Sequence, residues 1–120
     1  ASEKLKQQEY GIVITDYFRK QLKKFVKKDV RLKQNLKNEL INFSKQKAIP
    51  IGAGVYKVRI ARQGKGKSGG YRAYLFVMEV EGILTPLCIY AKNQKENLTF
   101  QELTWHLKNT KEELFVLLQN

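Results

Sequence analysis

Basic side chains gather between residues 55 and 72, in a stretch without a single acidic residue. Lys57 and Arg59 alternate with apolar residues, so we expect both on one face of a strand. Cations held by a rigid sheet can bind phosphate and stabilise the charge that develops during phosphoryl chemistry. The stretch is therefore predicted to form a phosphate-binding site, and its basic residues are Lys57, Arg59, Arg62, Lys65, Lys67 and Arg72.

Residues 63–70 contain four glycines and two lysines and are predicted to form an irregular loop. Together with Ala61 they resemble a loosened nucleotide-binding pattern, since Gly66, Lys67 and Ser68 follow at the right spacing. That pattern binds phosphate only where its loop opens a helix. Here a strand is expected to follow, so a nucleoside triphosphatase is excluded.

Other catalytic groups are scarce. The sequence has one cysteine, one histidine and no cluster of acids, so no metal site and no cofactor are expected. Cys88 lies among apolar residues and is predicted to be a buried free thiol, as in a reducing compartment. His106 is predicted to be a surface or partner-facing residue of a tail helix.

The remaining segments predict an α+β fold. A short strand over residues 10–15 leads into a helix that Thr15 and Asp16 cap, and Asp29 is expected to cap a second helix. Residues 48–54 are expected to be a connection. Strands over 55–62, 71–80 and 83–91 are predicted to form an antiparallel meander, because the links between them are short. The helical hairpin should cover one face of the sheet and the basic side chains the other.

The two ends of the chain have different predicted roles. Residues 1–9 are polar and expected to be a frayed or helical extension of a single domain over residues 1–120. Two capping patterns, Thr99 with Glu102 and Thr110 with Glu113, predict two successive C-terminal helices. No apolar run approaches the roughly 20 residues of a membrane helix, and no signal-peptide pattern is present. A soluble, cytoplasmic protein is expected.

The net charge of +12 is carried by the body of the chain. Residues 1–50 hold 13 basic and 5 acidic side chains, whereas residues 99–120 hold 2 and 3. Such a charge attracts polyanions, so nucleic acid, the ribosome or an acidic protein are the predicted partners. For most of the helical lysines a solvated helix face is the favoured interpretation.

Three stretches together resemble the RelE superfamily of bacterial toxins. They are Tyr56–Arg59, the glycine-lysine loop through Arg72, and the run Ile89–Leu98 before a capped helix. The loop is most similar to the HigB-like branch. The resemblance implies a RelE-like microbial RNase fold and the toxin of a type II toxin–antitoxin system. It also implies a cognate antitoxin as partner, with the toxin monomeric or in a hetero-oligomer with it; the tail helices join that interface or pack over the active patch.

The same resemblance implies a ribosome-dependent mRNA endonuclease that inhibits translation without a metal. The ribose 2′-OH attacks the adjacent phosphate and the 5′-oxygen leaves, which needs a base, an acid and cations. Residue by residue, it assigns catalysis to Lys57 as the base, Arg59 and Arg72 bracing the phosphate, and Lys92. RNA or rRNA binding falls to Arg62, Lys65, Lys67, Tyr74 and Lys95.

Two departures from RelE leave the acid unassigned. Asn93 stands where RelE carries an arginine. RelE also places a tyrosine in the segment that follows, and this sequence has no clear counterpart for it; Tyr74, Tyr90 or neither takes that place. Two other functions stay open. One is inhibition of DNA gyrase, as in the ParE relatives of this fold, and the other is a basic RNA-binding module without chemistry.

Overall fold

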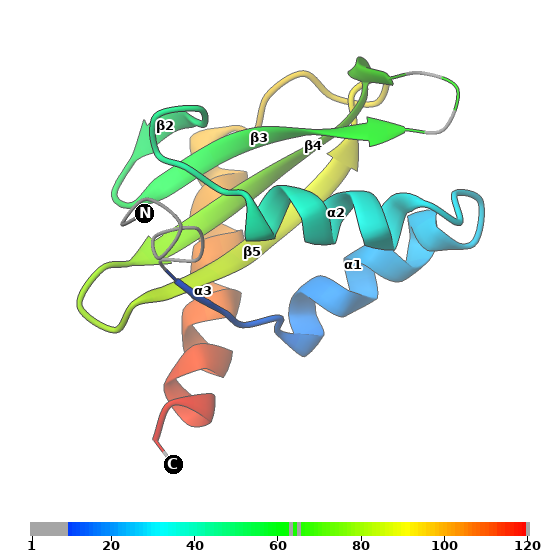
Figure 1. The fold of residues 1–120 in the computed structure, drawn as a ribbon. Helices are drawn as coiled ribbons and strands as arrows, with labels where there is room; N and C mark the ends of the chain where they lie inside the picture. Colours follow the sequence, from blue (N-terminus) through cyan, green and yellow to red (C-terminus); the bar gives the residue numbers. More distant parts are fainter. Residues whose placement is uncertain (1–9, 63, 65, 120) are drawn as a thin grey trace, which may run out of the picture.

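A computed structural model describes residues 10–62, 64 and 66–119 of the chain. Along the chain, a short strand is followed by two helices, four strands and a long helix (Figure 1). Their bounds are β1 Gly11–Ile12, α1 Asp16–Val26, α2 Leu32–Ile41, β2 Ile49–Gly52, β3 Val55–Arg62, β4 Gly66–Met78, β5 Ile83–Ala91 and α3 Phe100–Leu117.

The strands form one sheet in the order β1-β5-β4-β3-β2. Neighbours are antiparallel except β1, which pairs in parallel with Ile83 and Leu84 of β5. The predicted meander is thus confirmed, with a further strand at each edge. Beyond β1, the edge of β5 is completed by a side chain: the Gln21 amide donates to the Leu87 carbonyl at 3.1 Å and accepts from the Ile89 amide at 3.3 Å.

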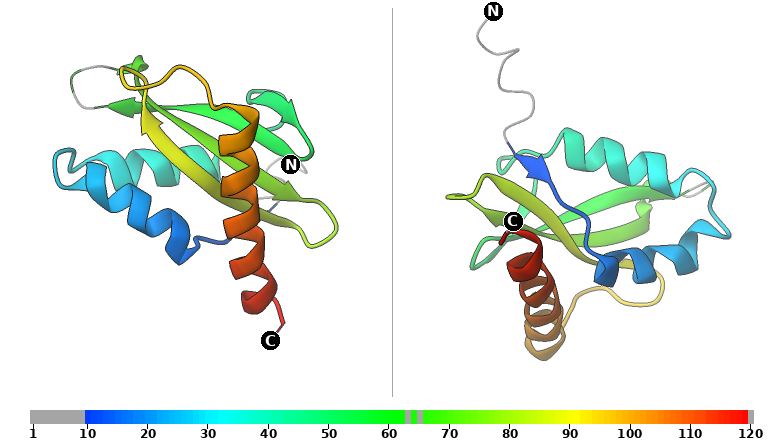
Figure 2. Two further views of the ribbon diagram at one scale, coloured as in Figure 1. Left: turned by 180° about the vertical axis from the view of Figure 1, so that it is seen from behind. Right: turned by 90° about the horizontal axis from the view of Figure 1, so that it is seen from below.

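Helices cover both faces of the sheet (Figure 2). The hairpin of α1 and α2 packs on one face through Phe18, Leu32 and Leu36 against Ile60 and Leu75. The helix α3 packs on the opposite face against Val55, Phe76 and Leu87. The basic side chains therefore lie on the face opposite the hairpin, as predicted, and they share that face with α3. In the described part of the chain, no helix has the length and apolarity needed to cross a membrane.

Four local predictions are wrong. Residues 49–52 form the edge strand β2 because their backbone pairs with β3, although Pro50 and Gly52 suggested a connection. Likewise β4 begins at Gly66, inside the predicted loop, where Arg62 pairs with Gly66 across a β-bulge. Asp29 lies ahead of the α2 N-cap residue Arg31; its carboxylate accepts the Arg31 amide and the Tyr71 hydroxyl.

The fourth correction concerns the C-terminal region, which is one helix. Thr99 and Glu102 form the predicted capping box at its start. Thr110, expected to begin a second helix, is instead buried inside α3, and its hydroxyl finds no hydrogen-bond partner among the residues that the structure describes. Glu113 turns to α1, where its carboxylate accepts the amides of Asp16 at 2.6 Å and Tyr17 at 3.1 Å. This contact fixes α3 to the N-terminus of α1.

Candidate functional site

The sheet face below α3 carries two rows of side chains from three neighbouring strands. In one row, Arg59, Arg72 and Tyr90 are direct cross-strand partners. In the next row, Lys57 pairs with Tyr74. Residues directly opposite on antiparallel strands have Cβ atoms about 4.5–5.5 Å apart. We call Lys57, Arg59 and Arg72 the basic face.

Two arginines directly opposite each other are unfavourable unless an anion joins them, since like charges repel at this position. Arg72 is buried, with 4% of its surface exposed. Its guanidinium donates to the carbonyls of Lys67 at 3.1 Å and Tyr71 at 3.2 Å, which fixes its position. Arg59 is exposed and makes no ion pair with any carboxylate of the described residues. One fixed and one free guanidinium together suit a phosphate group.

Tight packing sets the register of these arginines. A Cβ atom on Gly70 would lie 2.2 Å from the Ile60 carbonyl oxygen and 2.9 Å from the Arg62 amide nitrogen. Only glycine fits where β4 passes the bulge of β3. Since Arg72 follows two residues later, Gly70 keeps it opposite Arg59.

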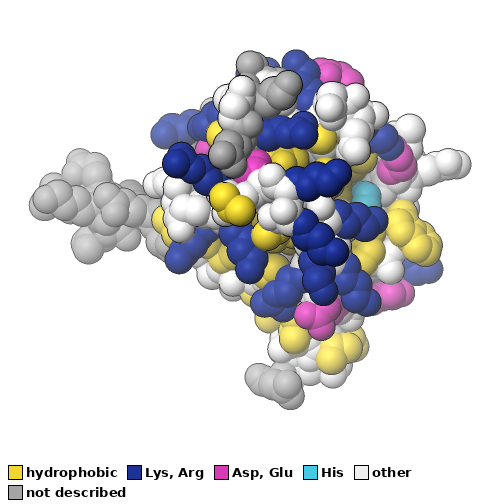
Figure 3. Space-filling view, turned by 90° about the vertical axis from the view of Figure 1, so that its right-hand side faces the viewer, with side chains coloured by type: hydrophobic (Ala, Val, Ile, Leu, Met, Phe, Trp, Pro, Cys, Tyr) yellow, Lys and Arg dark blue, Asp and Glu magenta, His cyan; other side chains and the backbone are white. Residues whose placement is uncertain are grey.

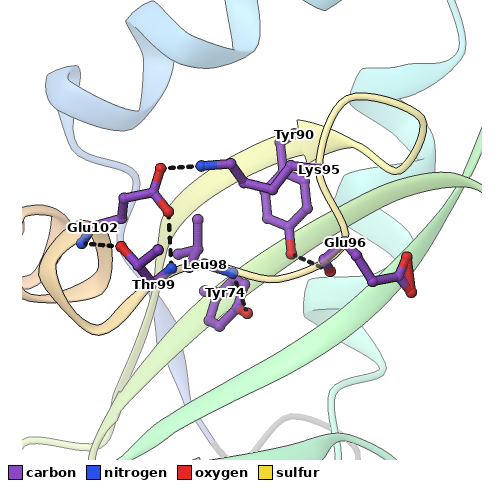
Figure 4. A network of polar contacts seen from close by, with 7 residues as sticks. All are labelled: Tyr74, Tyr90, Lys95, Glu96, Leu98, Thr99 and Glu102. Carbon is purple, nitrogen blue, oxygen red and sulfur yellow. Dashed lines mark hydrogen bonds and ion pairs between the residues drawn. The ribbon is translucent and has the colours of Figure 1, made fainter.

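Residues 92–98, the covering segment, cross over the two tyrosines of the face (Figure 4). Tyr90 donates its hydroxyl proton to the Glu96 carbonyl at 3.2 Å, and the Tyr74 hydroxyl accepts the Leu98 amide at 3.2 Å. Burial, followed by the neighbouring Tyr74, raises the pKa of the Tyr90 hydroxyl, so it stays protonated at neutral pH. Both tyrosines are buried and present no surface for RNA in this conformation.

The covering segment also engages the predicted base. The Lys57 ammonium donates to the Asn97 side-chain oxygen at 2.6 Å. Lys95 of the same segment forms an ion pair with Glu102, the capping-box residue of α3. The Lys95 ammonium lowers the pKa of the Glu102 carboxyl to about 2. The sequence analysis did not single out Asn97, although it lies within the run Ile89–Leu98, and it predicted Glu102 only as a helix-capping residue.

A pocket of about 320 Å³ flanks the basic face, beside the part of the outer edge of β3 that does not pair with β2. Lys57 and Arg59 line it together with Lys47, Lys67 and Glu39. Lys67 and Glu39 form an ion pair at 2.9 Å, which holds the glycine-lysine loop against α2. Lys47 adds a cation that no motif in the sequence indicated.

The remaining predicted site residues do not all join this arrangement. Arg62 is on the opposite face, with its guanidinium carbon 5.6 Å from the centre of the Tyr71 ring, because the β-bulge and strand alternation turn it away. Lys92 follows the end of β5, its amide bonded to the Gly70 carbonyl at 3.0 Å. Lys65 lies outside the described residues.

Two further expectations concern side chains that could react. Cys88 is buried as predicted, and burial raises the pKa of its thiol to about 12, which makes it unreactive. His106, predicted to be a surface or partner-facing residue, is half-buried, and its Nδ1 lies 2.6 Å from the Tyr17 hydroxyl. Burial lowers the pKa of the imidazole and raises that of the phenol, which favours the neutral form of both groups.

The comparisons with known proteins agree with this fold. The model of the family described as the RelE toxin of the RelE/RelB toxin–antitoxin system matches residues 12–119. A free-state structure of E. coli toxin RelE carrying two arginine-to-alanine mutations superposes with a TM-score of 0.52. It is 15% identical and covers 74% of this chain and 90% of its own, a similarity of fold. No curated protein matches the sequence.

The sheet and its helical hairpin have the fold of a small toxin of the RelE type. The match over nearly all of the described residues then gives the assignment directly: the chain belongs to the RelE toxin family.

Proposed function

We propose that this toxin is a ribosome-dependent mRNA endonuclease, and that the basic face cuts the message. The observation that carries the proposal is the convergence of Lys57, Arg59 and Arg72 from β3 and β4 on one face of the sheet. A ribosome positions a single strand of message, so the toxin itself needs only the groups that act on the phosphate.

In the proposed reaction, the ribose 2′-oxygen forms a bond to the adjacent phosphorus and the bond from phosphorus to the 5′-oxygen breaks. Lys57, in its neutral form, takes the proton of the 2′-OH. Arg59 and Arg72 bind the equatorial phosphate oxygens and stabilise their growing negative charge. Lys92 adds a cation at the end of β5. The leaving 5′-oxygen takes up a proton from water, so the products are a 2′,3′-cyclic phosphate and a free 5′-hydroxyl, and no step requires a metal ion.

The contact between Lys57 and Asn97 indicates that the covering segment must move before the message binds. In the free protein, the ammonium is already bonded to the Asn97 oxygen at 2.6 Å. A proton acceptor has to approach the 2′-OH to hydrogen-bond distance. We therefore propose that binding to the ribosome displaces Asn97 from Lys57.

The partner we propose is an antitoxin that covers the outer side of α3. Large apolar side chains are exposed there near the C-terminus, with Phe115 at 68% and Val116 at 63%. Exposed apolar patches of this kind commonly mark interaction surfaces. Replacing both residues with serine should weaken neutralisation by co-expressed cognate antitoxin and leave toxicity intact. We also place the chain in the HigB-like branch, on the similarity of its glycine-lysine loop.

Induction from a tightly controlled promoter tests the proposed function. Wild-type protein should destroy message integrity within minutes, with cuts visible by primer extension on a reporter mRNA. Intact message accompanied by damaged DNA would favour gyrase inhibition instead. Intact message and intact DNA, with RNA binding that falls steeply with salt, would leave a binding module without chemistry.

A further inference from the structure

A second groove, of about 660 Å³, runs along α1 on the side away from α2. Its walls are α1, the edge of β5 beyond β1, the covering segment and α3. Lysine and arginine side chains gather on this side of the molecule, with the histidine near them (Figure 3). We call it the α1–β5 groove; it lies beside the basic face and shares Tyr90 and Lys95 with the contacts that hold the covering segment.

One stripe of α1 forms the long wall of the groove. Tyr17, Gln21 and Lys24 follow at intervals of four and three residues, which places them on one side of the helix, and Lys28 follows just beyond its end. With a rise of 1.5 Å per residue, the helical stripe from Tyr17 to Lys24 is about 10 Å long, and Lys28 extends it. The groove can therefore hold an extended chain of several units rather than one small ion.

The two ends of the groove differ in charge. Lys24, Lys28 and Arg62 line the end near the C-terminus of α1. At the opposite end, the neutral pair of Tyr17 and His106 closes the wall between α1 and α3. Among the described residues, Glu102 is the only acidic side chain that lines the groove. Its charge is neutralised by the ion pair with Lys95.

Between these ends, the walls offer hydrogen-bonding groups and aromatic rings. Asn93 and Gln94 are exposed amides of the covering segment, and the half-buried Phe25 supplies ring surface. Phosphates prefer the cationic end, whereas base edges can bond to amides, a phenol or an imidazole. The groove on the other side of α1 has an apolar floor that includes Leu22, Val26 and Leu36, so it offers bases few such partners.

We propose that the α1–β5 groove is a second RNA-binding site, which holds several nucleotides of single-stranded RNA beside the basic face. Lys24, Lys28 and Arg62 bind its phosphates, and the covering segment lies between this RNA and the scissile bond. Binding here requires no chemistry at Lys57, so the site is independent of the cleavage reaction proposed above. The RNA belongs either to the message or to the ribosomal RNA, which share this chemistry.

The test uses full-length protein with Lys57→Ala, which removes cleavage, and a fluorescently labelled single-stranded RNA. Anisotropy is measured at several salt concentrations. The added pair K24A/K28A should lower affinity at least about tenfold and flatten the slope of log K against log salt by roughly 1.4, which corresponds to two lost phosphate contacts. The matched pair K23A/K27A removes the same charge from the opposite side of α1 and should lower affinity less than about threefold.

A second readout comes from His106, the only histidine of the chain. Its imidazole proton resonances should shift when RNA is added to the Lys57→Ala protein. They should stay in place when the same RNA is added to protein that also carries K24A/K28A. Equal losses from both lysine pairs, no loss from K24A/K28A, or unmoved His106 resonances with bound RNA would overturn the site. None of these outcomes bears on cleavage, because every sample carries Lys57→Ala.

The source of the RNA is found on the ribosome. A photo-crosslinker is attached at Asn93→Cys in the Lys57→Ala protein; Cys88 is buried and does not compete for the reagent. Crosslinks to the message or to ribosomal RNA identify which strand occupies the groove. Crosslinks to ribosomal protein alone would contradict the proposal.

Discussion

Arg59 and Arg72 lie directly opposite each other on β3 and β4, one exposed and the other buried. This placement costs stability, since like charges in direct cross-strand positions repel. Arg59→Ala should therefore leave the free energy of unfolding unchanged or raise it by up to about 1 kcal/mol. The same change should lower the cleavage rate about 100-fold or more, because a cation is lost from the reacting phosphate. Urea unfolding and single-turnover cleavage on ribosomes measure the two effects. A stable variant that cuts at the wild-type rate would rule out a catalytic role for Arg59.

Gly70 controls the register of the basic face. Gly70→Ala places a methyl group against the Ile60 carbonyl and should cost about 1–3 kcal/mol, as overpacking usually does. Cleavage should fall in the fraction that stays folded, since Arg72 moves relative to Arg59. Gly11→Ala is the control, because its methyl group would meet only the Gly82 oxygen, at 3.8 Å. Similar unfolding midpoints for the two variants in urea would contradict this role.

Glu113 completes the N-terminus of α1 from a distant part of the chain. Thr15 accepts the Phe18 amide, and Glu113 accepts the two amides before it. Loss of a helix cap costs about 1 kcal/mol, and a carboxylate at a helix N-terminus adds a favourable charge. Glu113→Ala should destabilise the fold by about 1–2 kcal/mol. Glu112→Ala removes an exposed carboxylate from the same turn of α3 and should change the unfolding midpoint little.

The pair of Tyr17 and His106 should make stability depend on pH. Burial lowers the pKa of His106 from its usual 6.5, so the unfolded chain binds its proton first as the pH falls. The pair therefore stabilises the fold above about pH 6.5, and this contribution is lost towards the lower, folded-state pKa. Unfolding in urea between about pH 7.5 and 5.5 should show the loss in wild type and a flatter dependence in His106→Gln. Equal pH dependences would show that His106 does not titrate as described.

Asn97 holds Lys57 in the free protein, so its removal should favour the open form of the site. A net hydrogen bond of this type is worth about 0.5–1.5 kcal/mol. Asn97→Ala should therefore lower the KM for programmed ribosomes by a few-fold at similar kcat. Gln101→Ala, an exposed change at the start of α3, serves as control. A raised KM in Asn97→Ala alone would mean that Asn97 contributes to the bound state instead.

The sequence predicted the elements whose signals are local. The alternation of Val55–Arg62, the strand at Ile83–Ala91 and the capping box of Thr99 and Glu102 are all present in the structure. The strand β2 was missed because its pairing with β3 is a tertiary contact that overrides Pro50 and Gly52. The capping pattern of Thr110 and Glu113 wrongly predicted the start of a second C-terminal helix, because Glu113 caps α1 instead.

For the site, the sequence indicated which cations share a face but not what lies over them. Strand alternation was enough to place Lys57 with Arg59, and the register then adds Arg72. The covering segment could not be anticipated, since its contacts join Asn97 to Lys57 and Leu98 to Tyr74 across 40 and 24 residues of chain. The bulge that turns Arg62 away also depends on the pairing of two strands.

The most direct test of the central claim is cleavage of a reporter mRNA by purified protein on programmed ribosomes, mapped by primer extension. Wild-type protein should give discrete cuts with 5′-hydroxyl ends. The Lys57→Ala protein should give none, although urea unfolding shows that it is folded. Folded protein carrying both Lys57→Ala and Arg72→Ala that still cuts at the wild-type rate would contradict the assignment of the basic face as the catalytic site.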